Sequence, residues 1–428
     1  MSYILVALIG IAFLATGAAV AYGIGAASVL AFIASDNLRY LAIMPQRIFS
    51  QIDVFALMAM PLFILAGEIM NRAGITKALI EFSMAMVGRL KGGLGHVNVM
   101  ASVFFAGISG SAVADAAALG STLVPAMREK GYSPIYAAAI TAASSIIGPI
   151  IPPSIVMIFY GAIMQTSVAA LFVAGVIPGL MLAGVLFAMN AYFAYRDDHP
   201  GGRGDDVPNF GPAFVHALPS LSLPAIIMGG IVFGVVTPTE AAALAVVAAL
   251  VVGLYYGGLD RSGLMASLHQ TAMLTGSVFI ILGAVACFGW LAGHEQLPQK
   301  LATFVTELGF GRVEYMLAIN LIFVIAGMFL DVPVALALLV PLLAPPALAL
   351  GADPVHLGIA LCLNLTIGLI TPPLGGCLLV VSAVTKVDYW VLARAILPFA
   401  VGEVALLLVI VLVPGCSLFL PRMFGLVN

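Results

Sequence analysis

Oxygen-bearing side chains are scarce in this chain, and several lie beside glycines inside long apolar runs. Ser109 and Ser111 belong to the segment 106–115, AGISGSAVAD, which we call the first glycine segment. Hydroxyls and exposed main-chain carbonyls are oxygen ligands that suit a hard monovalent cation such as Na⁺. Asp115 ends the segment, and a carboxylate within apolar sequence is a functional candidate by default. We therefore consider Asp115 for shaping a cation site or for proton coupling.

The second glycine segment, 326–335, reads AGMFLDVPVA and gives Asp331 the same candidate role. An interruption of a helix within the hydrocarbon is tolerated only where the freed backbone faces protein or a water-filled cavity. We expect each glycine segment to be an unwound break in a helix, the first helix covering about 97–127 and the second about 313–350.

Two other segments contain consecutive prolines. The first proline segment, 148–154, reads GPIIPPS, and the second, 368–375, reads GLITPPLG and contains Thr371. Because proline lacks an N–H and blocks the preceding turn, one helix ends there and another begins. The flanking apolar runs of about 13 residues are too short to cross a bilayer alone. We expect re-entrant helical hairpins at about 134–164 and 354–385, with a proline-kinked crossing helix as the alternative.

Glycines and prolines recur at one fixed spacing. Shifting the chain by 220 residues superposes its two halves without a gap over some seventy residues. Such ordered matches predict two structural repeats, which are inverted if an odd number of crossings separates them. The matched pairs are Gly107/Gly327, Pro125/Pro345, Gly131/Gly351, Pro134/Pro354, Gly148/Gly368, Pro152/Pro372, Pro153/Pro373 and Pro178/Pro398.

The composition indicates a membrane protein. Of 428 residues, 63% are hydrophobic and 8% charged, whereas soluble domains carry about a quarter charged residues. Long continuous apolar runs predict an all-α polytopic protein rather than an outer-membrane barrel. We expect a first half over 1–195, a hydrophilic connecting loop over 196–216 and a second half over 217–428. The net charge of −3, without a basic cluster, argues against a nucleic-acid partner, and no ATP-binding P-loop motif occurs.

Five stretches in order resemble the large membrane subunit (M subunit, DctM-like) of tripartite ATP-independent periplasmic (TRAP) transporters. They are GISGSAVADAAALGS at 107–121, GPIIPPSIVMIFYG at 148–161, SVAALFVAGVIPG at 167–179, VTPTEAAALA at 236–245 and LNLTIGLITPPLG at 363–375. The resemblance implies a Na⁺-coupled importer in the bacterial inner membrane, with an elevator mechanism like that of the ion transporter superfamily. It also implies a small membrane subunit (Q) and a periplasmic binding protein (P) as partners.

The resemblance further implies which residues bind ions and substrate. Substrates in this family are small carboxylates such as C4-dicarboxylates and sialic acid, and two or more Na⁺ ions but no organic cofactor are expected. The first Na⁺ site would be formed around Ala106, Ser109, Gly148, Ile151 and Pro153, and the second around Gly327, Gly368, Thr371 and Leu374. The candidate substrate contacts are Ser111, Ser144, Ser154 and Asn364.

Two other functions fit parts of the sequence. The Gly-Ile-Ser-Gly motif that contains Ser109 fits an intramembrane serine protease, but such an enzyme needs a histidine base beside the serine. The second glycine segment lacks the serine altogether, which favours a shared geometry over a nucleophile. A passive channel or a scaffolding subunit would need no sodium gradient, so sodium-dependent uptake separates these readings from the transporter.

Overall fold

The computed structural model describes residues 20–34, 38–201 and 207–427. Within these ranges the elements are helical, apart from an isolated β-bridge between Lys91 and Gly201. Six of the described helices are long and apolar enough to cross a bilayer, or seven if one bent pair counts as a span. The prediction of an all-α polytopic membrane protein is therefore confirmed.

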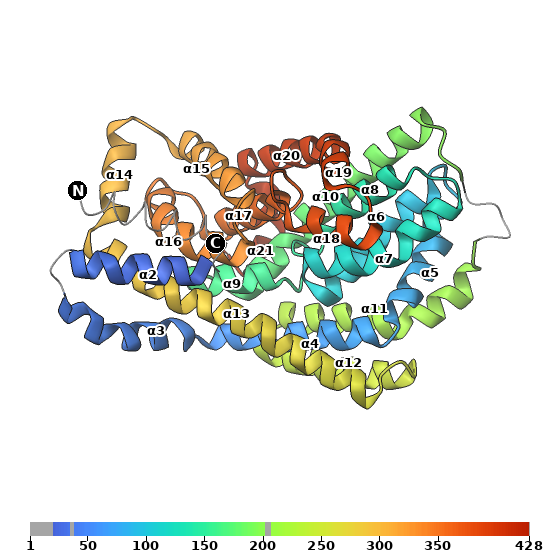
Figure 1. The fold of residues 1–428 in the computed structure, drawn as a ribbon, viewed down its shortest axis with the longest axis horizontal. Helices are drawn as coiled ribbons and strands as arrows, with labels where there is room; N and C mark the ends of the chain where they lie inside the picture. The colour runs from blue at the N-terminus through green and yellow to red at the C-terminus, as the bar shows by residue number, and fades with distance from the viewer. Residues whose placement is uncertain (1–19, 35–37, 202–206, 428) are drawn as a thin grey trace.

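The helices form two layers (Figure 1). The layer that we call the scaffold runs along the lower side of the view and contains the long helices α4, α12 and α13. It comprises η1 (Leu38–Ile43), α3 (Met44–Ile52), η2 (Phe55–Met58), α4 (Ala59–Arg72), α11 (Phe210–Val232), α12 (Pro238–Tyr255) and α13 (Arg261–His294).

The other layer, which we call the inner helices, contains all glycine and proline segments. It comprises α6 (Gly93–Ser109), α7 (Ala112–Glu129), α8 (Pro134–Ser145), α9 (Ile155–Met164), α10 (Val168–Arg196), α15 (Arg312–Gly327), α16 (Val332–Ala349), α17 (Pro354–Gly368), α18 (Gly376–Thr385), α19 (Tyr389–Ala395), α20 (Leu397–Leu412) and α21 (Gly415–Met423). The helices α2 (Val20–Ala34), α5 (Ile75–Val87) and α14 (Leu297–Glu307) flank or connect the two layers.

Helices α6 and α7 form a re-entrant hairpin. They pack against each other and are joined through Gly110, which has a left-handed conformation with φ of 58°. Their far ends also meet, because the N–H of Leu94 at the start of α6 donates to the hydroxyl of Tyr132 just beyond α7 (3.2 Å). The first glycine segment is thus the tip of a hairpin that enters and leaves on one side.

Helices α8 and α9 together cross the molecule. Their contacts with the two ends of the uninterrupted helix α10 show this. Tyr136 in the first turn of α8 donates its hydroxyl to Asn190 near the end of α10 (2.6 Å). Gly161 in α9 instead lies against Val168, at the start of α10. The chain therefore advances along the whole length of α10, and the first proline segment interrupts this crossing midway.

The second half is built in the same order. The Tyr315 hydroxyl near the start of α15 donates to the Leu343 carbonyl near the end of α16 (2.9 Å), so these two helices form a second hairpin. Gly358 in α17 faces Leu171 at the start of α10, whereas α18 packs along α7. In Figure 1, α15, α16 and α17 lie at the left and α6, α7 and α18 at the right. The two hairpins enter from opposite ends, and the inverted repeats stay a prediction.

These packing contacts correct the predicted assignment of hairpins. We expected hairpins at 134–164 and 354–385 and interrupted crossing helices at 97–127 and 313–350, but the structure exchanges the two roles. Prolines end a helix without setting the direction of the next one, so two arms that are each too short to cross can cross in series. The alternative of a proline-interrupted crossing helix is the correct one.

The connecting loop between the halves is shorter than predicted. Helix α10 ends at Arg196 and α11 begins at Phe210, so residues 210–216 of the expected loop are helical, while residues 202–206 lie outside the described ranges. The aromatic rings of Phe210 and Phe214 pack on Phe82 of α5, with centroids 5.7 and 5.6 Å apart. These ring contacts stabilise helix where the charge pattern indicated loop, while Phe210 and Phe214 remain partly exposed.

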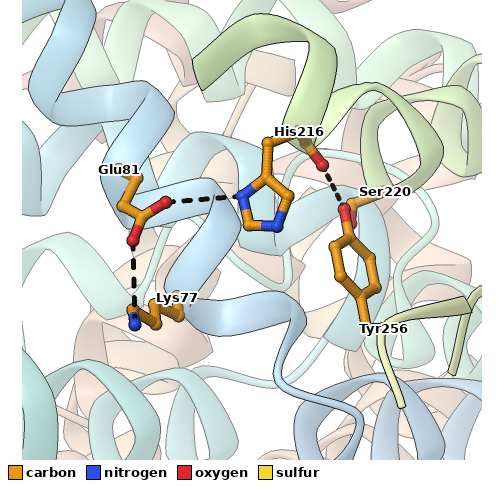
Figure 2. A network of polar contacts seen from close by, with 5 residues as sticks. All are labelled: Lys77, Glu81, His216, Ser220 and Tyr256. Atoms are coloured by element: carbon orange, nitrogen blue, oxygen red, sulfur yellow. Dashed lines mark hydrogen bonds and ion pairs between the residues drawn. The ribbon is translucent and has the colours of Figure 1, made fainter. Parts of the chain in front are cut away.

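Polar contacts add to this attachment of α5 to the scaffold (Figure 2). The His216 Nδ1 of α11 lies 3.4 Å from a Glu81 oxygen, and Lys77 approaches the other Glu81 oxygen at 4.0 Å. The Tyr256 hydroxyl at the end of α12 donates to the His216 carbonyl and lies 3.2 Å from the Ser220 hydroxyl. Exposed ion pairs each contribute at most about 1 kcal/mol, so the network orients α5 more than it stabilises it.

A capping box starts helix α12. The Glu240 N–H donates to the Thr237 hydroxyl oxygen (3.3 Å), and the Thr237 N–H donates to the Glu240 carboxylate (2.7 Å). Pro238 occupies the first helical position, where its missing N–H costs nothing. Glu240 therefore caps a scaffold helix.

Candidate functional site

The tip of the first hairpin abuts the first proline segment. A Cβ added at Gly110 would lie 2.7 Å from the Pro153 carbonyl oxygen, and Gly110 also has a positive φ that other residues rarely adopt. On the other side of the hairpin, a Cβ at Gly107 would lie 2.5 Å from the Pro224 side chain of α11. Glycine is therefore required for the tip to fit between the proline segment and the scaffold.

Asp115 is enclosed at this contact. Its carboxyl group is fully buried, and Oδ1 accepts a hydrogen bond from the Ser109 hydroxyl. The second oxygen, Oδ2, has no hydrogen-bond partner within the described residues. A Cβ at Gly148 would lie 2.4 Å from Oδ2, so this oxygen faces the main chain of the first proline segment. An unpartnered buried carboxylate oxygen is costly, and a cation held between it and nearby carbonyls would satisfy it.

Ser111 begins the returning helix of this hairpin. Its hydroxyl accepts from the Ala114 N–H (3.4 Å), and its own N–H donates to the Ser109 hydroxyl oxygen (3.2 Å). Helix α7 therefore starts beside the carboxylate of Asp115, with its positive dipole end at the tip.

In the second half, main chain packs directly on main chain. A Cβ added at Gly368 would lie 2.7 Å from the Gly327 carbonyl oxygen, so the end of α15 touches the start of the second proline segment. Asp331 precedes α16 at the tip of the second hairpin, and its exposed side chain makes no capping bond. Here the oxygens brought together are mainly those of the backbone.

Two hydroxyls hold the second proline segment. Thr371 donates to the Ile367 carbonyl of α17 (2.8 Å). Tyr389, the first residue of α19, donates a shared hydrogen bond to the carbonyls of Pro373 (2.7 Å) and Leu374 (3.0 Å). The peptide bonds Pro152–Pro153 and Pro372–Pro373 are both cis.

Two cavities meet at the hairpin tips. The first has a volume of about 320 Å³ and lies between the scaffold, both tips and the first proline segment. The second, of about 510 Å³, lies between the second tip, the second proline segment and helices α2 and α13. Both cavities are lined by Asp331, Leu369, Ser277 and Ile281.

Comparison with protein families identifies the chain. Residues 7–416 match the family model of the "Tripartite ATP-independent periplasmic transporter, DctM component". The chain belongs to this family. It is a TRAP large permease subunit, as the five sequence stretches predict.

Relatives of similar length support this assignment. The sialic acid TRAP transporter large permease protein SiaM of Vibrio cholerae is 40% identical over 400 residues, covering 92% of this chain and 93% of the relative. The C4-dicarboxylate TRAP transporter large permease protein DctM of Pseudomonas aeruginosa is 38% identical over 403 residues, covering 94% and 93%. Among solved structures, the YdaH transporter of Alcanivorax borkumensis shares the fold, with a TM-score of 0.65 at 15% identity over 92% of this chain and 90% of that chain.

Several residues that the TRAP resemblance implies for cation binding lie together. Ser109 and Gly148 meet at Asp115, Pro153 lies against Gly110 of the same hairpin tip, and Gly327 meets Gly368. Ala106 is buried in α6, and the Ile151 side chain packs on Gly179 of α10. Thr371 and Leu374 lie further along the second proline segment, where Leu374 lines the second cavity.

The predicted substrate contacts of the TRAP subunit separate into two groups. Ser111 lines the first cavity, and the buried Ser154 caps α9 by accepting from the Met157 N–H (3.2 Å). Ser144 donates to Asn98 between α8 and α6 (3.0 Å), and Asn364 donates to Asn320 between α17 and α15 (2.8 Å). Ser144, Ser154 and Asn364 line neither cavity, and contact of all four residues with substrate stays a prediction.

None of the predicted site residues belongs to the scaffold side of the site, although Glu68 stands out in the sequence as a charge within an apolar run. Glu68 and Asn71 of α4 and Ser277 of α13 line the first cavity opposite the tips. Glu68 forms an ordinary i,i+4 ion pair with Arg72 (3.5 Å), a pattern common on any helix surface. Only the packing of α4 and α13 against the hairpins reveals that these residues face the site.

Proposed function

We propose that this TRAP large permease subunit is the Na⁺-coupled transport subunit of an inner-membrane importer for a small carboxylate. In this proposal a periplasmic binding protein delivers the substrate, and a small membrane subunit completes the complex. The relatives named for sialic acid and C4-dicarboxylates support a carboxylate substrate.

The observation that carries the proposal is the environment of Asp115. Its unpartnered Oδ2, the hydroxyl of Ser109 and the main chain around Gly148 provide oxygen in one enclosed place. A hard monovalent cation is the ligand that such oxygens favour. The same group argues against the protease alternative, because the Ser109 hydroxyl donates to a carboxylate and no histidine lines the first cavity.

A second Na⁺ site in this proposal lies at the contact of Gly327 with the second proline segment. Interrupted helices leave carbonyls without the N–H partners that a following turn would supply. Thr371 adds a hydroxyl oxygen whose hydrogen already bonds to Ile367, so its lone pairs remain available to a cation.

The first cavity is the proposed substrate site. A volume of about 320 Å³ is at the lower end of the range for small-molecule sites and suits a small organic acid. The N-termini of α7 and α16 face it and present partial positive charge to a carboxylate. The negative charges of Asp115 and Asp331 counteract this partial positive charge. A substrate anion therefore binds well only after cations neutralise these acids. That dependence couples ions to substrate.

Movement in this proposal follows an elevator mechanism, in which the inner helices slide against the scaffold. Each Na⁺ that enters gains about 2.3 kcal/mol per 100 mV of membrane potential. Two Na⁺ ions that enter with one singly charged anion carry a net charge of one. At 100 mV the potential then contributes about 2.3 kcal/mol, which corresponds to about fortyfold accumulation of the substrate inside.

The test is reconstitution of the complete three-component system in proteoliposomes with a panel of sialic acid and C4-dicarboxylates. We expect uptake of one carboxylate that requires an inward sodium gradient and ceases when choline replaces sodium. Uptake of equal rate without sodium would support a passive channel and reject the coupling.

A further inference from the structure

The two proline segments are held in different ways. In the first, the Ser154 hydroxyl donates to the Pro149 carbonyl and accepts from Met157, so the segment closes on itself. The position 220 residues later is Leu374, which has no hydroxyl. The second proline segment therefore lacks this internal fastening.

Tyr389 supplies the missing hydrogen bond from outside the segment. Its hydroxyl reaches the carbonyls of Pro373 and Leu374, at 2.7 and 3.0 Å. The position of Tyr389 is itself fixed, because the Asp388 carboxylate caps α19 by accepting from the N–H groups of Trp390 (3.0 Å) and Val391 (3.1 Å). The corresponding residue in the first half is Ala169, which has no side-chain donor.

Helix α19 stays with the inner helices. It packs against α8, α18 and α20, all of which belong to that layer. The hydrogen bond from Tyr389 therefore joins two parts of one body rather than the body to the scaffold.

A carbonyl oxygen has two lone pairs. A hydrogen bond from Tyr389 to one lone pair leaves the second available to a cation and fixes the direction in which the carbonyl points. Leu374 is 47% exposed and lines the second cavity. Loss of the hydroxyl would leave these carbonyls free to turn away.

We propose that Tyr389 is the positioning residue of the second cation site, acting through the main-chain carbonyls of Pro373 and Leu374. The part of this inference that concerns sodium binding rests on the proposed function. The part that concerns the hold of Tyr389 on the second proline segment rests on the geometry alone.

The experiment uses the complete membrane complex, with Leu374→Cys as a labelling position and Cys416→Ala to remove the one partly exposed native thiol. The other native cysteines are buried. The rate of reaction with a small maleimide is measured as sodium replaces choline. The comparison is between this parent, Tyr389→Phe, and Tyr315→Phe, which removes a matched hydroxyl-to-carbonyl bond at the mouth of the second hairpin.

We expect Tyr389→Phe to label faster than the parent and to need about three- to tenfold more sodium for half-protection, the effect of one lost hydrogen bond. Tyr315→Phe should match the parent. Tyr389→Ala should change both quantities at least as much.

Equal labelling and equal sodium dependence in Tyr389→Phe and the parent would overturn the inference. Faster labelling in Tyr389→Phe with no sodium protection in either protein would support the fastening and reject the proposed sodium site. A Tyr315→Phe effect as large as that of Tyr389→Phe would also overturn it, because the change would then be general loosening.

Discussion

In the proposed function, Asp115 and Thr371 offer oxygen to a cation in two different ways. Asp115 brings a buried charge with one oxygen already bonded to Ser109 and the other unpartnered. Thr371 brings a neutral hydroxyl that donates to the Ile367 carbonyl at the end of α17. The first site should therefore depend on charge, and the second on the path of the main chain.

Asp115→Asn tests the charge. Asparagine keeps the size of the side chain and an acceptor for the Ser109 hydroxyl but removes the negative charge. We expect the sodium concentration for half-maximal uptake to rise at least about tenfold, because bonds to charged groups contribute about 1.5–3 kcal/mol. The measurement is sodium-dependent uptake in proteoliposomes. The control is Glu314→Gln, because Glu314 is an exposed acid in the first turn of α15. Equal sodium dependence in the two variants would contradict the role of Asp115.

Thr371→Val tests the hydroxyl of the second site. We expect sodium activation to weaken several-fold while the thermal midpoint of the purified protein changes little, since only one hydrogen bond of about 1 kcal/mol is lost. Thr366→Val is a matched control, because the Thr366 hydroxyl makes the same kind of bond one turn earlier, to Leu363 (2.8 Å). A larger effect of Thr366→Val on sodium activation would remove Thr371 from the site.

At the scale of elements, glycines determine how closely the helix ends approach. Gly148→Ala would place a methyl group 2.4 Å from Asp115 Oδ2, so either the proline segment or the carboxylate must move. We expect loss of most sodium-dependent uptake in Gly148→Ala. Gly184→Ala in α10, where no described atom outside the local helix backbone lies within 4 Å of the added Cβ, should retain uptake and gain up to about 1 kcal/mol of helix stability. Wild-type sodium dependence in Gly148→Ala would show that this contact is not essential.

The same elements indicate what sequence reasoning can supply. Interruptions at Gly110 and at Pro152–Pro153 followed from the chemistry of the residues themselves, because glycine and proline act locally on the backbone. The direction of the chain after each interruption did not follow, since it depends on which neighbouring helix the next segment packs against. The position of Glu68 opposite the hairpin tips and the bonds from Tyr389 to the second proline segment did not follow for a related reason, because what these side chains face lies on other elements.

At the scale of the whole molecule, the proposed elevator motion requires a surface that slides. Gly67 of α4 is part of that surface, since a Cβ there would lie 3.3 Å from the Ile108 carbonyl oxygen and from the Ser109 Cα. We expect Gly67→Val to slow uptake strongly while sodium still raises the thermal midpoint of the purified protein. Gly229→Val, where space around the added Cβ is open, is the control. Loss of both uptake and the sodium effect would indicate a damaged binding site rather than an arrested motion.

Asp331 lines both cavities at once, and its carboxylate forms no ion pair among the residues that the structure describes. A positive charge that enters either chamber lowers the electrostatic cost of an anion in the other. By thermodynamic reciprocity, a bound anion then retains the cation to the same extent. In the proposed function, one shared acid thus links the binding affinities of the cation and the anion, without any contact between the two solutes.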